Sequence, residues 1–493
     1  MSTEDILKGG QPIKIEEISG PGTKPHDILE FEALLRCQDA QLFGACGFEK
    51  IGKVVLTRAH SRLDIMGGIA DYCGANVLES TLEPSAIVGC QTRKDRELRA
   101  LSLGPESDSC LGLGISIDDF YLHGRLKSYS QIQELFARNP KTDWAAHVLG
   151  GFYAVLSERK ISHLPHGATI ALKSSIPACA GIASSAAIEI SALMAINNLY
   201  KLELTSKEIA RIGQIVENRV VGVPCGPIDH IVAADGKPGE ILSILCQPDR
   251  ILGSVVLPPN TRLIGIDSKI KRASNAVYID ARTSTLMGLT ILKKELNLKE
   301  LRTNYLCNLS IEDFRQRCRR FLPTVMEGEQ FIKRYGKLVD APTEITPKKH
   351  YRIRSRVEHP IYEHARVRQF IRCIENANND KNNTKNYLTR AGQLMYASHW
   401  SYRYRVGLGS AQVEQIVNSV RTLGTDGGFY GARMSSRGEG GTVSVLCHGD
   451  ISSALIQTLA AYKLTWGFEA DIFNTTAPAA YESKHSVLRL LQA

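Results

Sequence analysis

The sequence predicts a mixed fold of the α/β (α+β) class, because strand-like and helix-like segments follow one another along the chain. The run GATIALKSSIP at 167–177 is β-branched and apolar and ends at a proline, and SSAAIEISALMAINNLY at 184–200 has the apolar spacing of a helix. Further strands are predicted at 53–57, 241–246 and 262–268, and further helices at 26–44 and 205–222. The 493 residues are about three times the modal domain size, so we expect two domains.

The composition and the first residues favour a globular protein of the cytoplasm. Apolar residues at 43% and charged residues at 23% are near the globular average, and no stretch approaches the ~20 apolar residues that span a bilayer. The first ten residues carry an acidic pair and no apolar run of a secretory signal. The twelve cysteines lack a C-x-x-C pair or zinc-ligand spacing, so we expect them to be reduced and mostly structural.

The net charge of +9 is spread along the chain. Its densest basic runs, at 315–320 and 348–356, alternate with apolar residues and are interpreted as solvated faces. Without an aromatic platform or a zinc module they do not predict a nucleic-acid surface. The segment 281–390 is helix-like and charged, and the Asn-rich stretch at 376–386 is expected to be a mobile surface loop.

The segment IPACAGIASSAAIEIS at 176–191 places small residues and two serines between a strand and the first turn of a long helix. The free backbone N–H groups and the helix dipole at such a turn attract anions, and small side chains let a phosphate approach the backbone. The alternative is close helix packing with Ser184 as an ordinary N-cap. The chain contains neither a G-x-x-x-x-G-K-[ST] loop nor a G-x-G-x-x-G loop here.

Two further stretches carry candidate chemistry. In ENRVVGVPCGPIDH at 217–230, Glu217 with Ser185 suits a magnesium nucleotide, and Asp229 suits a base for an acceptor hydroxyl. The alternatives are a solvated Glu217 and a helix N-cap at Asp229. In TRAHSRLDIMGGIADYCGANVL at 57–78, an arginine can offset charge on a phosphoryl group and carboxylates can hold sugar hydroxyls, although a turn with an incidental Asp-Tyr would read the same way.

These three stretches, in this order, resemble the GHMP kinase superfamily, and SRLDIMGGIADY at 61–72 resembles the signature of plant-type L-arabinokinases. The likeness continues through CGPIDH, HPIYEHARV and GGTVSV and covers roughly residues 50–480. It implies a ribosomal S5 domain 2-like N-terminal region and a ferredoxin-like C-terminal region. The predicted division is an N-terminal extension at 1–49, an ATP-binding domain at 50–258, and a C-terminal domain at 259–493 with a helical insertion at about 281–390.

The resemblance also implies roles for individual residues and a reaction. By position, Asp229 and Arg62 match the catalytic pair, Ser185 and Glu217 the magnesium ligands, and Asp71, Gly226 and Tyr278 the sugar contacts. The ATP-phosphate loop matches Pro177, Ala178, Cys179, Ala180, Gly181, Ile182, Ala183, Ser184, Ser185 and Ala186. The implied enzyme is an ATP- and Mg²⁺-dependent sugar 1-kinase, monomeric or a small homo-oligomer, with L-arabinose as acceptor. The alternatives are galactose or a uronic acid as acceptor, or a weakened homologue that senses sugar and nucleotide.

The chain departs from the family pattern in three places. Cys179 and Ala183 replace small loop residues, and Cys179 would be strained if its φ is positive. The later glycine loop reads SRGEGG at 436–441, which adds Arg437 and Glu439. Arg403 and Arg405 fall close to the expected acceptor site, and they indicate either an anionic or larger acceptor or a change at the surface.

Overall fold

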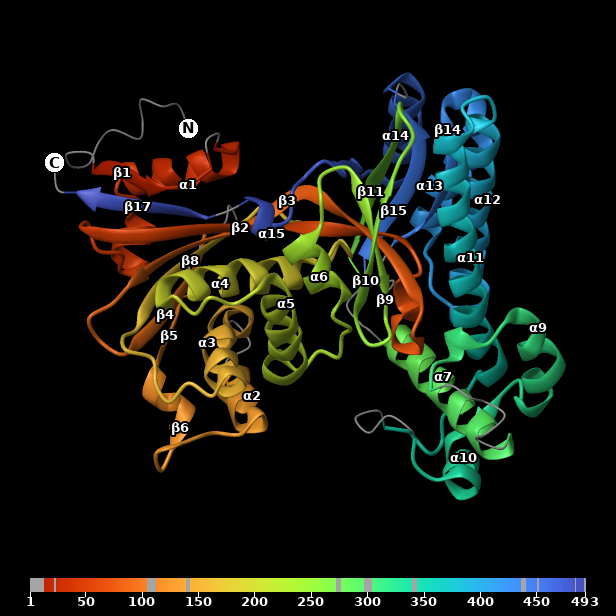
Figure 1. Ribbon diagram of the computed structural model, residues 1–493, viewed down its shortest axis with the longest axis horizontal. Helices are drawn as coiled ribbons and strands as arrows, with labels where there is room; N and C mark the ends of the chain where they lie inside the picture. The colour runs from red at the N-terminus through yellow and green to blue at the C-terminus, as the bar shows by residue number, and fades with distance from the viewer. Residues whose placement is uncertain are drawn as a thin grey trace.

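The computed structural model describes residues 13–21, 24–103, 112–138, 142–271, 276–296, 304–338, 344–435, 440–449, 452–483 and 485–491. Two β-sheets organise this part of the chain, one large and one small, with helices on their faces (Figure 1). The α/β (α+β) class predicted from the sequence is confirmed.

The large sheet contains nine of the described strands. Their order is β1 (Lys14–Ser19), β17 (Ser486–Leu491), β2 (Gly52–Met66), β3 (Asn76–Thr92), β8 (Ala168–Ser174), β4 (Glu97–Leu103) and β5 (Gly112–Ser116), with β9 (Glu240–Leu245) on β3 and β10 (Arg250–Val256) on β9. The β4–β8 pair is parallel, and the other pairs are antiparallel. The sheet therefore uses strands from both ends of the chain.

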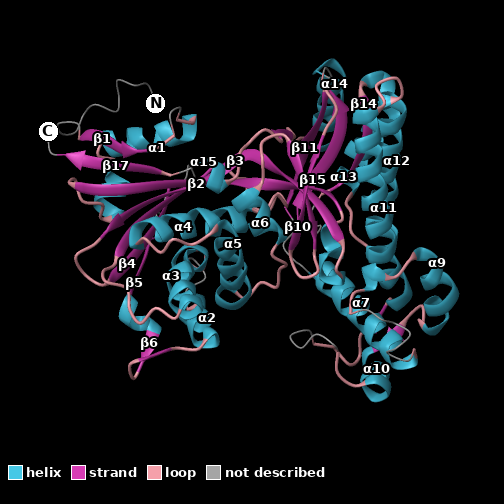
Figure 2. Ribbon diagram, in the orientation of Figure 1, coloured by secondary structure: helices cyan, strands magenta, loops and turns pink. Residues whose placement is uncertain are grey.

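Helices cover both faces of the large sheet (Figure 2). On one face lie α2 (Tyr129–Ala137), α3 (Ala145–Arg159), α4 (Ser184–Tyr200), α5 (Ser206–Ile215) and α6 (Ile228–Asp235), and α1 (His26–Arg36) covers the other face. The α1 packing requires a glycine in β3, because a Cβ built on Gly89 would lie 2.5 Å from Phe31 Cζ. The capping box predicted at the start of α5 is present, with the Glu208 backbone N–H donating to Thr205 Oγ1 at 3.3 Å.

The small sheet has the order β14 (Phe429–Met434), β15 (Gly440–His448), β11 (Thr261–Lys271) and β16 (Asp471–Asn474). The helices that pack beside it are α12 (Thr384–Ser401), α13 (Ala411–Leu423) and α14 (Ser452–Trp466), and α11 (Ile353–Asn379) forms a long hairpin with α12. α7 (Ala276–Glu295) crosses beneath α11 toward a small subdomain with α9 (Ile311–Asp313), β12 (Met326–Glu327), α10 (Gly328–Tyr335) and β13 (His350–Tyr351). The short elements β6 (Tyr121–Leu122), β7 (Arg125–Leu126) and α15 (Ala480–Ser483) complete the fold.

Three local predictions were wrong. The helix predicted at 26–44 ends at Arg36, because Gln38 has a φ of 51° and breaks the helical path. The strand predicted at 53–57 runs on to Met66, so Arg62 and Asp64 lie inside β2 instead of after it. The Asn-rich segment 376–386 is not a long loop, since α11 reaches Asn379 and α12 begins at Thr384.

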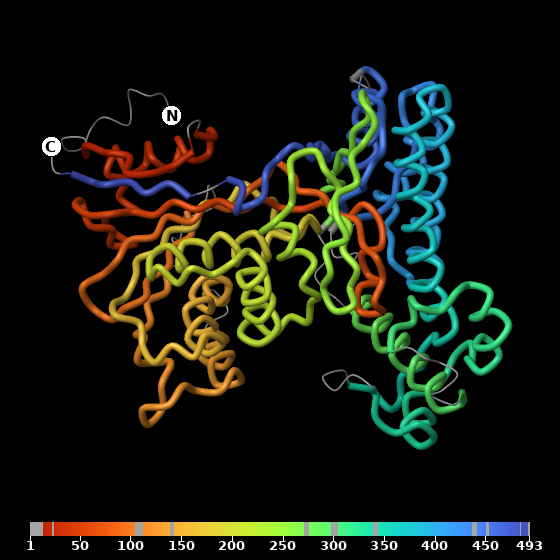
Figure 3. The backbone as a smooth tube through the Cα atoms, viewed as in Figure 1, coloured from red at the N-terminus to blue at the C-terminus, as the bar shows by residue number. Residues whose placement is uncertain are grey.

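The domain division of the chain stays a prediction. The boundary near residue 258 falls between β10 of the large sheet and β11 of the small sheet. However, β1 from the predicted extension pairs with β17 from the predicted C-terminal domain, and β17 pairs with β2. The backbone trace shows β1, in red, beside β17, in blue, at one end of the large sheet (Figure 3). Within the described ranges, no helix combines the length and the apolar character needed to cross a bilayer.

Candidate functional site

The loop between β8 and α4 has a tight left-handed backbone. Cys179 and Ala183 each have a φ of 59°, and Gly181 has a φ of 79°. The condition for strain at Cys179 is therefore met, because its positive φ lies in a region that favours glycine. Ala183, and not Ser184, is the N-cap of α4, so both serines of the loop lie in the first helical turn.

Arg62 holds the loop from β2. Its Nη1 donates to the Gly181 carbonyl oxygen at 2.9 Å, and its backbone N–H donates to the Ile182 carbonyl oxygen at 3.0 Å. From the small sheet, Thr442 Oγ1 donates to the Ala180 carbonyl oxygen at 2.7 Å. Because three of its carbonyls point to protein donors, the loop is fixed between the two sheets.

The same arginine pairs with Asp229 in the first turn of α6. Arg62 Nε lies 2.9 Å from Asp229 Oδ1 and 3.2 Å from Glu79 Oε1, and the Arg62 side chain is 4% exposed. Burial lowers the pKa of Arg62, but the carboxylates of Asp229 and Glu79 more than offset this, so its pKa is raised. A cation that stays charged beside Asp229 can offset negative charge that develops during a reaction.

Ser185 and Glu217 lie together at the start of α4. Ser185 Oγ donates to Glu217 Oε1 at 2.9 Å. Glu217 sits in η5 (Val216–Val221), a π-helical turn that continues α5 and ends at Gly222, whose φ is 88°. A hydroxyl and a carboxylate side by side are oxygen donors of the kind that Mg²⁺ prefers, so these two residues fit the predicted magnesium site.

Behind this pair lies the buried Glu189, which the sequence motifs did not identify as a site residue. Glu189 of α4 is fully buried, with Oε1 at 2.7 Å from His147 Nδ1 and Oε2 at 2.6 Å from His230 Nε2. Burial and, to a smaller extent, the nearby Glu217 raise the pKa of Glu189 to about 8, against a lowering effect of His230. The signal in the sequence was a single charge in the otherwise apolar run AAIEISAL at 186–193.

The three predicted sugar contacts line one pocket of about 200 Å³. Asp71 comes from the loop after β2, Gly226 from the loop before α6, and Tyr278 from α7. Gly226 leaves room for the Asp71 carboxylate, since a Cβ at Gly226 would lie 2.6 Å from Asp71 Oδ2. The pocket also includes Tyr72, Pro224, Cys225, Pro227, Cys246, Pro248 and Arg282, of which Arg282 was missed although it lies one helical turn after Tyr278.

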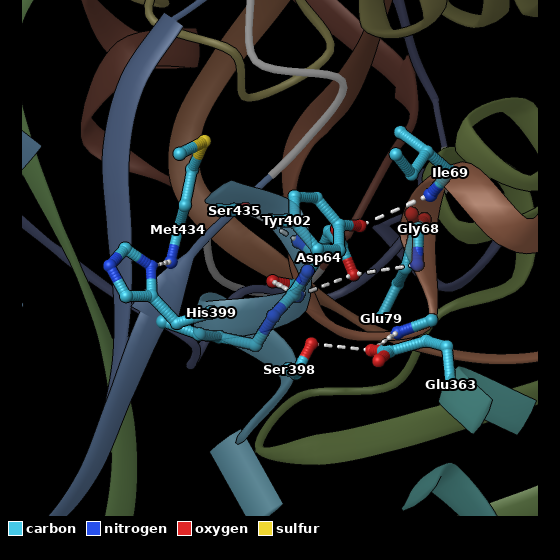
Figure 4. A network of polar contacts seen from close by, with 12 residues as sticks. Asp64, Gly68, Ile69, Glu79, Glu363, Ser398, His399, Tyr402, Met434 and Ser435 are labelled. Carbon is cyan, nitrogen blue, oxygen red and sulfur yellow. Dashed lines mark hydrogen bonds and ion pairs between the residues drawn. The ribbon is translucent and has the colours of Figure 1, made fainter. Parts of the chain in front are cut away.

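A buried polar network surrounds the start of the 67–73 segment that carries Asp71 (Figure 4). Asp64 Oδ1 accepts from Arg433 Nη1 at 3.0 Å and from the Gly68 backbone N–H at 3.3 Å. Tyr402 Oη accepts from the Ile69 backbone N–H at 3.2 Å, and Arg433 lies 4.5 Å from the Tyr402 ring centroid. This network joins β2, the 67–73 loop and the small sheet.

The departures from the family pattern are placed as follows. Arg403 pairs with Glu414, and Arg405 lies 3.3 Å from Glu358 Oε2. Neither arginine lines the pocket of Asp71 and Tyr278. Their placement favours the second of the two interpretations, a change at the surface. Arg437 and Glu439 lie outside the described residues.

Comparison with known proteins identifies the class of fold. Residues 147–237 match the GHMP kinases N terminal domain. The structure resembles Lactococcus lactis galactokinase complexed with galactose, with a TM-score of 0.68 and 19% identity over 91% of this chain and 99% of that chain. It also resembles Methanococcus jannaschii mevalonate kinase, with a TM-score of 0.53 and 15% identity over 89% and 98% of the two chains. The chain therefore has the GHMP kinase fold that its motifs predicted.

One particular relative is similar along most of this chain. L-arabinokinase of Arabidopsis thaliana is 29% identical over 89% of the chain, which spans about half (47%) of that protein's length. The predicted resemblance to the GHMP kinases and to L-arabinokinase is thereby confirmed.

Proposed function

We propose that this protein is a sugar 1-kinase that transfers the γ-phosphoryl group of Mg-ATP to the anomeric hydroxyl of a free monosaccharide, with L-arabinose as the preferred acceptor. The single observation that carries the proposal is the position of Arg62. Its guanidinium bonds both the Gly181 carbonyl of the candidate phosphate loop and the Asp229 carboxylate beside the acceptor pocket. One buried cation thus links the two halves of a phosphoryl-transfer site.

The residues have separate roles in binding phosphate, Mg²⁺ and sugar. ATP supplies the phosphoryl group. The loop at 177–186 offers the backbone N–H groups and the positive end of α4 to phosphates, and Ser185 with Glu217 offers oxygen ligands to Mg²⁺. Asp71 accepts from sugar hydroxyls, with Gly226 and Tyr278 shaping the pocket around them.

Asp229 accepts the proton of the anomeric hydroxyl as the new O–P bond forms, while Arg62 offsets the negative charge on the transferring group. The products are a sugar 1-phosphate and ADP. We place this reaction in the cytoplasm, in a monomer or a small homo-oligomer that binds neither nucleic acid nor membranes.

The preference for L-arabinose rests on the L-arabinokinase relative and on the GGIADY segment at 67–72. Galactose remains an alternative acceptor. A uronic acid is the second candidate, because the cationic Arg282 lines the same pocket as Asp71 and Tyr278.

The test is ADP release from Mg-ATP, measured over a panel of free pentoses, hexoses and uronic acids. We expect the highest kcat/KM with L-arabinose, an acid-labile sugar 1-phosphate as product, and no turnover when Mg²⁺ is removed with EDTA. Activity only on a phosphorylated or non-sugar alcohol would overturn the acceptor. Binding of sugar and nucleotide without ADP release would instead identify a sensor.

A further inference from the structure

We propose that Glu217, Cys225 and His230 form a binding site for a borderline or thiophilic divalent cation such as Zn²⁺, which overlaps the Mg²⁺ pair Ser185 and Glu217 at Glu217. A carboxylate oxygen of Glu217, the Cys225 sulfur and an imidazole nitrogen of His230 lie within 4.8 Å of one another. Oxygen, thiolate sulfur and imidazole nitrogen are the donors that Zn²⁺ takes in proteins. Mg²⁺ prefers oxygen ligands, so Cys225 and His230 add nothing to its binding.

The two ring nitrogens of His230 differ in their partners. Both His230 and Glu189 are fully buried, and His230 Nε2 lies 2.6 Å from Glu189 Oε2 and 3.5 Å from Glu217 Oε2. The other ring nitrogen, Nδ1, is buried and has no hydrogen-bond partner within the part of the chain that the structure describes. An ion bound through Nδ1 would keep the contact of Nε2 with Glu189, the arrangement of histidine ligands that hold a carboxylate on their other nitrogen.

Glu189 is itself held in place. Its second oxygen, Oε1, lies 2.7 Å from His147 Nδ1 of α3. The carboxylate that orients His230 is therefore anchored between two helices and does not have to move when an ion binds.

The Cys225 backbone is fixed by Asn218 and Gln214. The Cys225 N–H donates to Asn218 Oδ1 at 2.8 Å, and its carbonyl oxygen accepts from Asn218 Nδ2 at 3.0 Å and from Gln214 Nε2 at 3.2 Å. Cys225 is half-buried and lines the acceptor pocket, so an ion can reach it from that side. The ligand atoms of Glu217, Cys225 and His230 come from one segment of the chain and already lie within 4.8 Å of one another. This preorganisation lowers the entropic cost of binding an ion.

The site shares Glu217 with the magnesium pair. An ion held by Cys225 and His230 draws on the same carboxylate that accepts from Ser185. Under the proposed function, on which this step rests, Zn²⁺ therefore competes with Mg²⁺ and inhibits the kinase. The binding of Zn²⁺ itself does not depend on that function.

The binding test uses the full chain without nucleotide. Titration with Cd²⁺ should produce the ultraviolet absorption of a thiolate–metal bond at a stoichiometry of one, and Zn²⁺ should displace it. In Cys225→Ser the absorption should vanish, and in Cys225→Ser and His230→Gln the Zn²⁺ affinity should fall at least tenfold. Cys373→Ser, at a half-buried cysteine of α11, is the matched control and should behave as the wild type.

Circular dichroism establishes that each variant is folded. If folded Cys225→Ser keeps the absorption, or if the Zn²⁺ affinity is the same in wild type, Cys225→Ser and His230→Gln, the site is overturned. A loss of absorption shared equally by Cys373→Ser would overturn it as well, because the signal would then come from other thiols.

Inhibition of ADP release by Zn²⁺ distinguishes a failure of the metal site from a failure of the proposed function. Zn²⁺ should inhibit ADP release competitively with Mg²⁺, and Cys225→Ser should need at least tenfold more Zn²⁺ for the same fractional loss of its own rate. If the wild type releases no ADP, the proposed function fails, and the absorption titration still decides whether the metal site exists.

Discussion

Asp229 is the residue on which the proposed reaction depends most directly. In Asp229→Asn the shape is kept, while the proton acceptor and the charge facing Arg62 are removed. We expect kcat to fall by about 10²- to 10⁴-fold, the usual contribution of a general base. ADP release measures the rate, and calorimetry should show that sugar still binds.

The control for this change is Asp235→Asn, at the other end of α6. It should retain the wild-type kcat. A near-wild-type kcat in Asp229→Asn would remove this aspartate from the proton-transfer role.

Cys179 carries a backbone cost that can be relieved. A left-handed conformation costs a non-glycine residue roughly 1–2 kcal/mol, and glycine loses roughly 0.5–1 kcal/mol more entropy on folding. With a φ of 59° at this position, Cys179→Gly should therefore raise the free energy of unfolding by about 0.5–1 kcal/mol. Chemical denaturation measures the change.

Cys179→Ala tests the reason for the gain. It removes the thiol and keeps the Cβ, so it should not be stabilising. Equal stabilisation by alanine and glycine would show that the thiol, and not the backbone, carries the cost.

At the scale of elements, the Asp64–Arg433 pair joins β2 of the large sheet to β14 of the small sheet. The two side chains are 1% and 0% exposed and lie 3.0 Å apart. Arg433→Met leaves a buried carboxylate without its main partner, and such a loss costs about 3–5 kcal/mol of unfolding free energy. The double variant Asp64→Leu/Arg433→Met should be less destabilised than Arg433→Met alone.

The surface pair Lys463–Glu469 is the matched comparison, since its side chains are 57% and 80% exposed. Glu469→Gln should change the unfolding free energy by no more than about 0.5 kcal/mol. A similarly small effect of Arg433→Met would mean that the buried pair does not hold the two sheets together.

The α11 helix adds a pH-dependent contribution through Glu363, which accepts from the Gly67 backbone N–H at 3.3 Å. Burial raises the pKa of Glu363, but Arg366, His359 and Arg433 lower it more, to about 2 from an ordinary 4.5. The depressed pKa stabilises the fold above about pH 4.5, and this stabilisation of about 3 kcal/mol is lost as the pH falls toward 2.

Glu363→Gln should therefore reduce stability at pH 7 and flatten the stability profile between pH 5 and 2. Glu375→Gln, at an exposed position of the same helix, should keep the wild-type slope. An unchanged slope in Glu363→Gln would contradict the assignment.

At the scale of the whole molecule, the C-terminal strand completes the large sheet. Leu488 in β17 is fully buried against the α1 side of the sheet. Leu488→Ala should cost about 2–5 kcal/mol of unfolding free energy by leaving a cavity. Arg489→Ala, at a half-exposed position next to it, should cost little, and equal effects of the two would place Leu488 outside the core.

The sequence predicted best what short-range patterns determine. α4 begins and ends where its apolar spacing and loop indicated, and Thr205 caps α5 as predicted. The end of β2 was predicted nine residues too early, at 57 instead of Met66. Arg62 and Asp64 are typical of loops in the sequence, and only the structure shows that Asp229 and Arg433, from distant parts of the chain, neutralise them.

The candidate site residues were also predicted best where a short sequence motif contains them. Asp71, Gly226 and Tyr278 were predicted as sugar contacts from the family resemblance, and all three line one pocket. Glu189 and Arg282 were missed, because only the packing of α4 and α7 shows what their charges face.

The pairing of β1 with β17 places Lys14 opposite Leu491, so the two ends of the described chain are strand neighbours. Leu490 in turn pairs with Gly52, ten residues before Arg62 along β2, a distance of roughly 33 Å at the usual rise of a strand. A short linker across these ends, with new ends opened at the exposed turn of His123 and Gly124, would give a circular permutant in which every site contact described above is retained. The order of the segments along the chain is thus separable from the architecture that assembles the site.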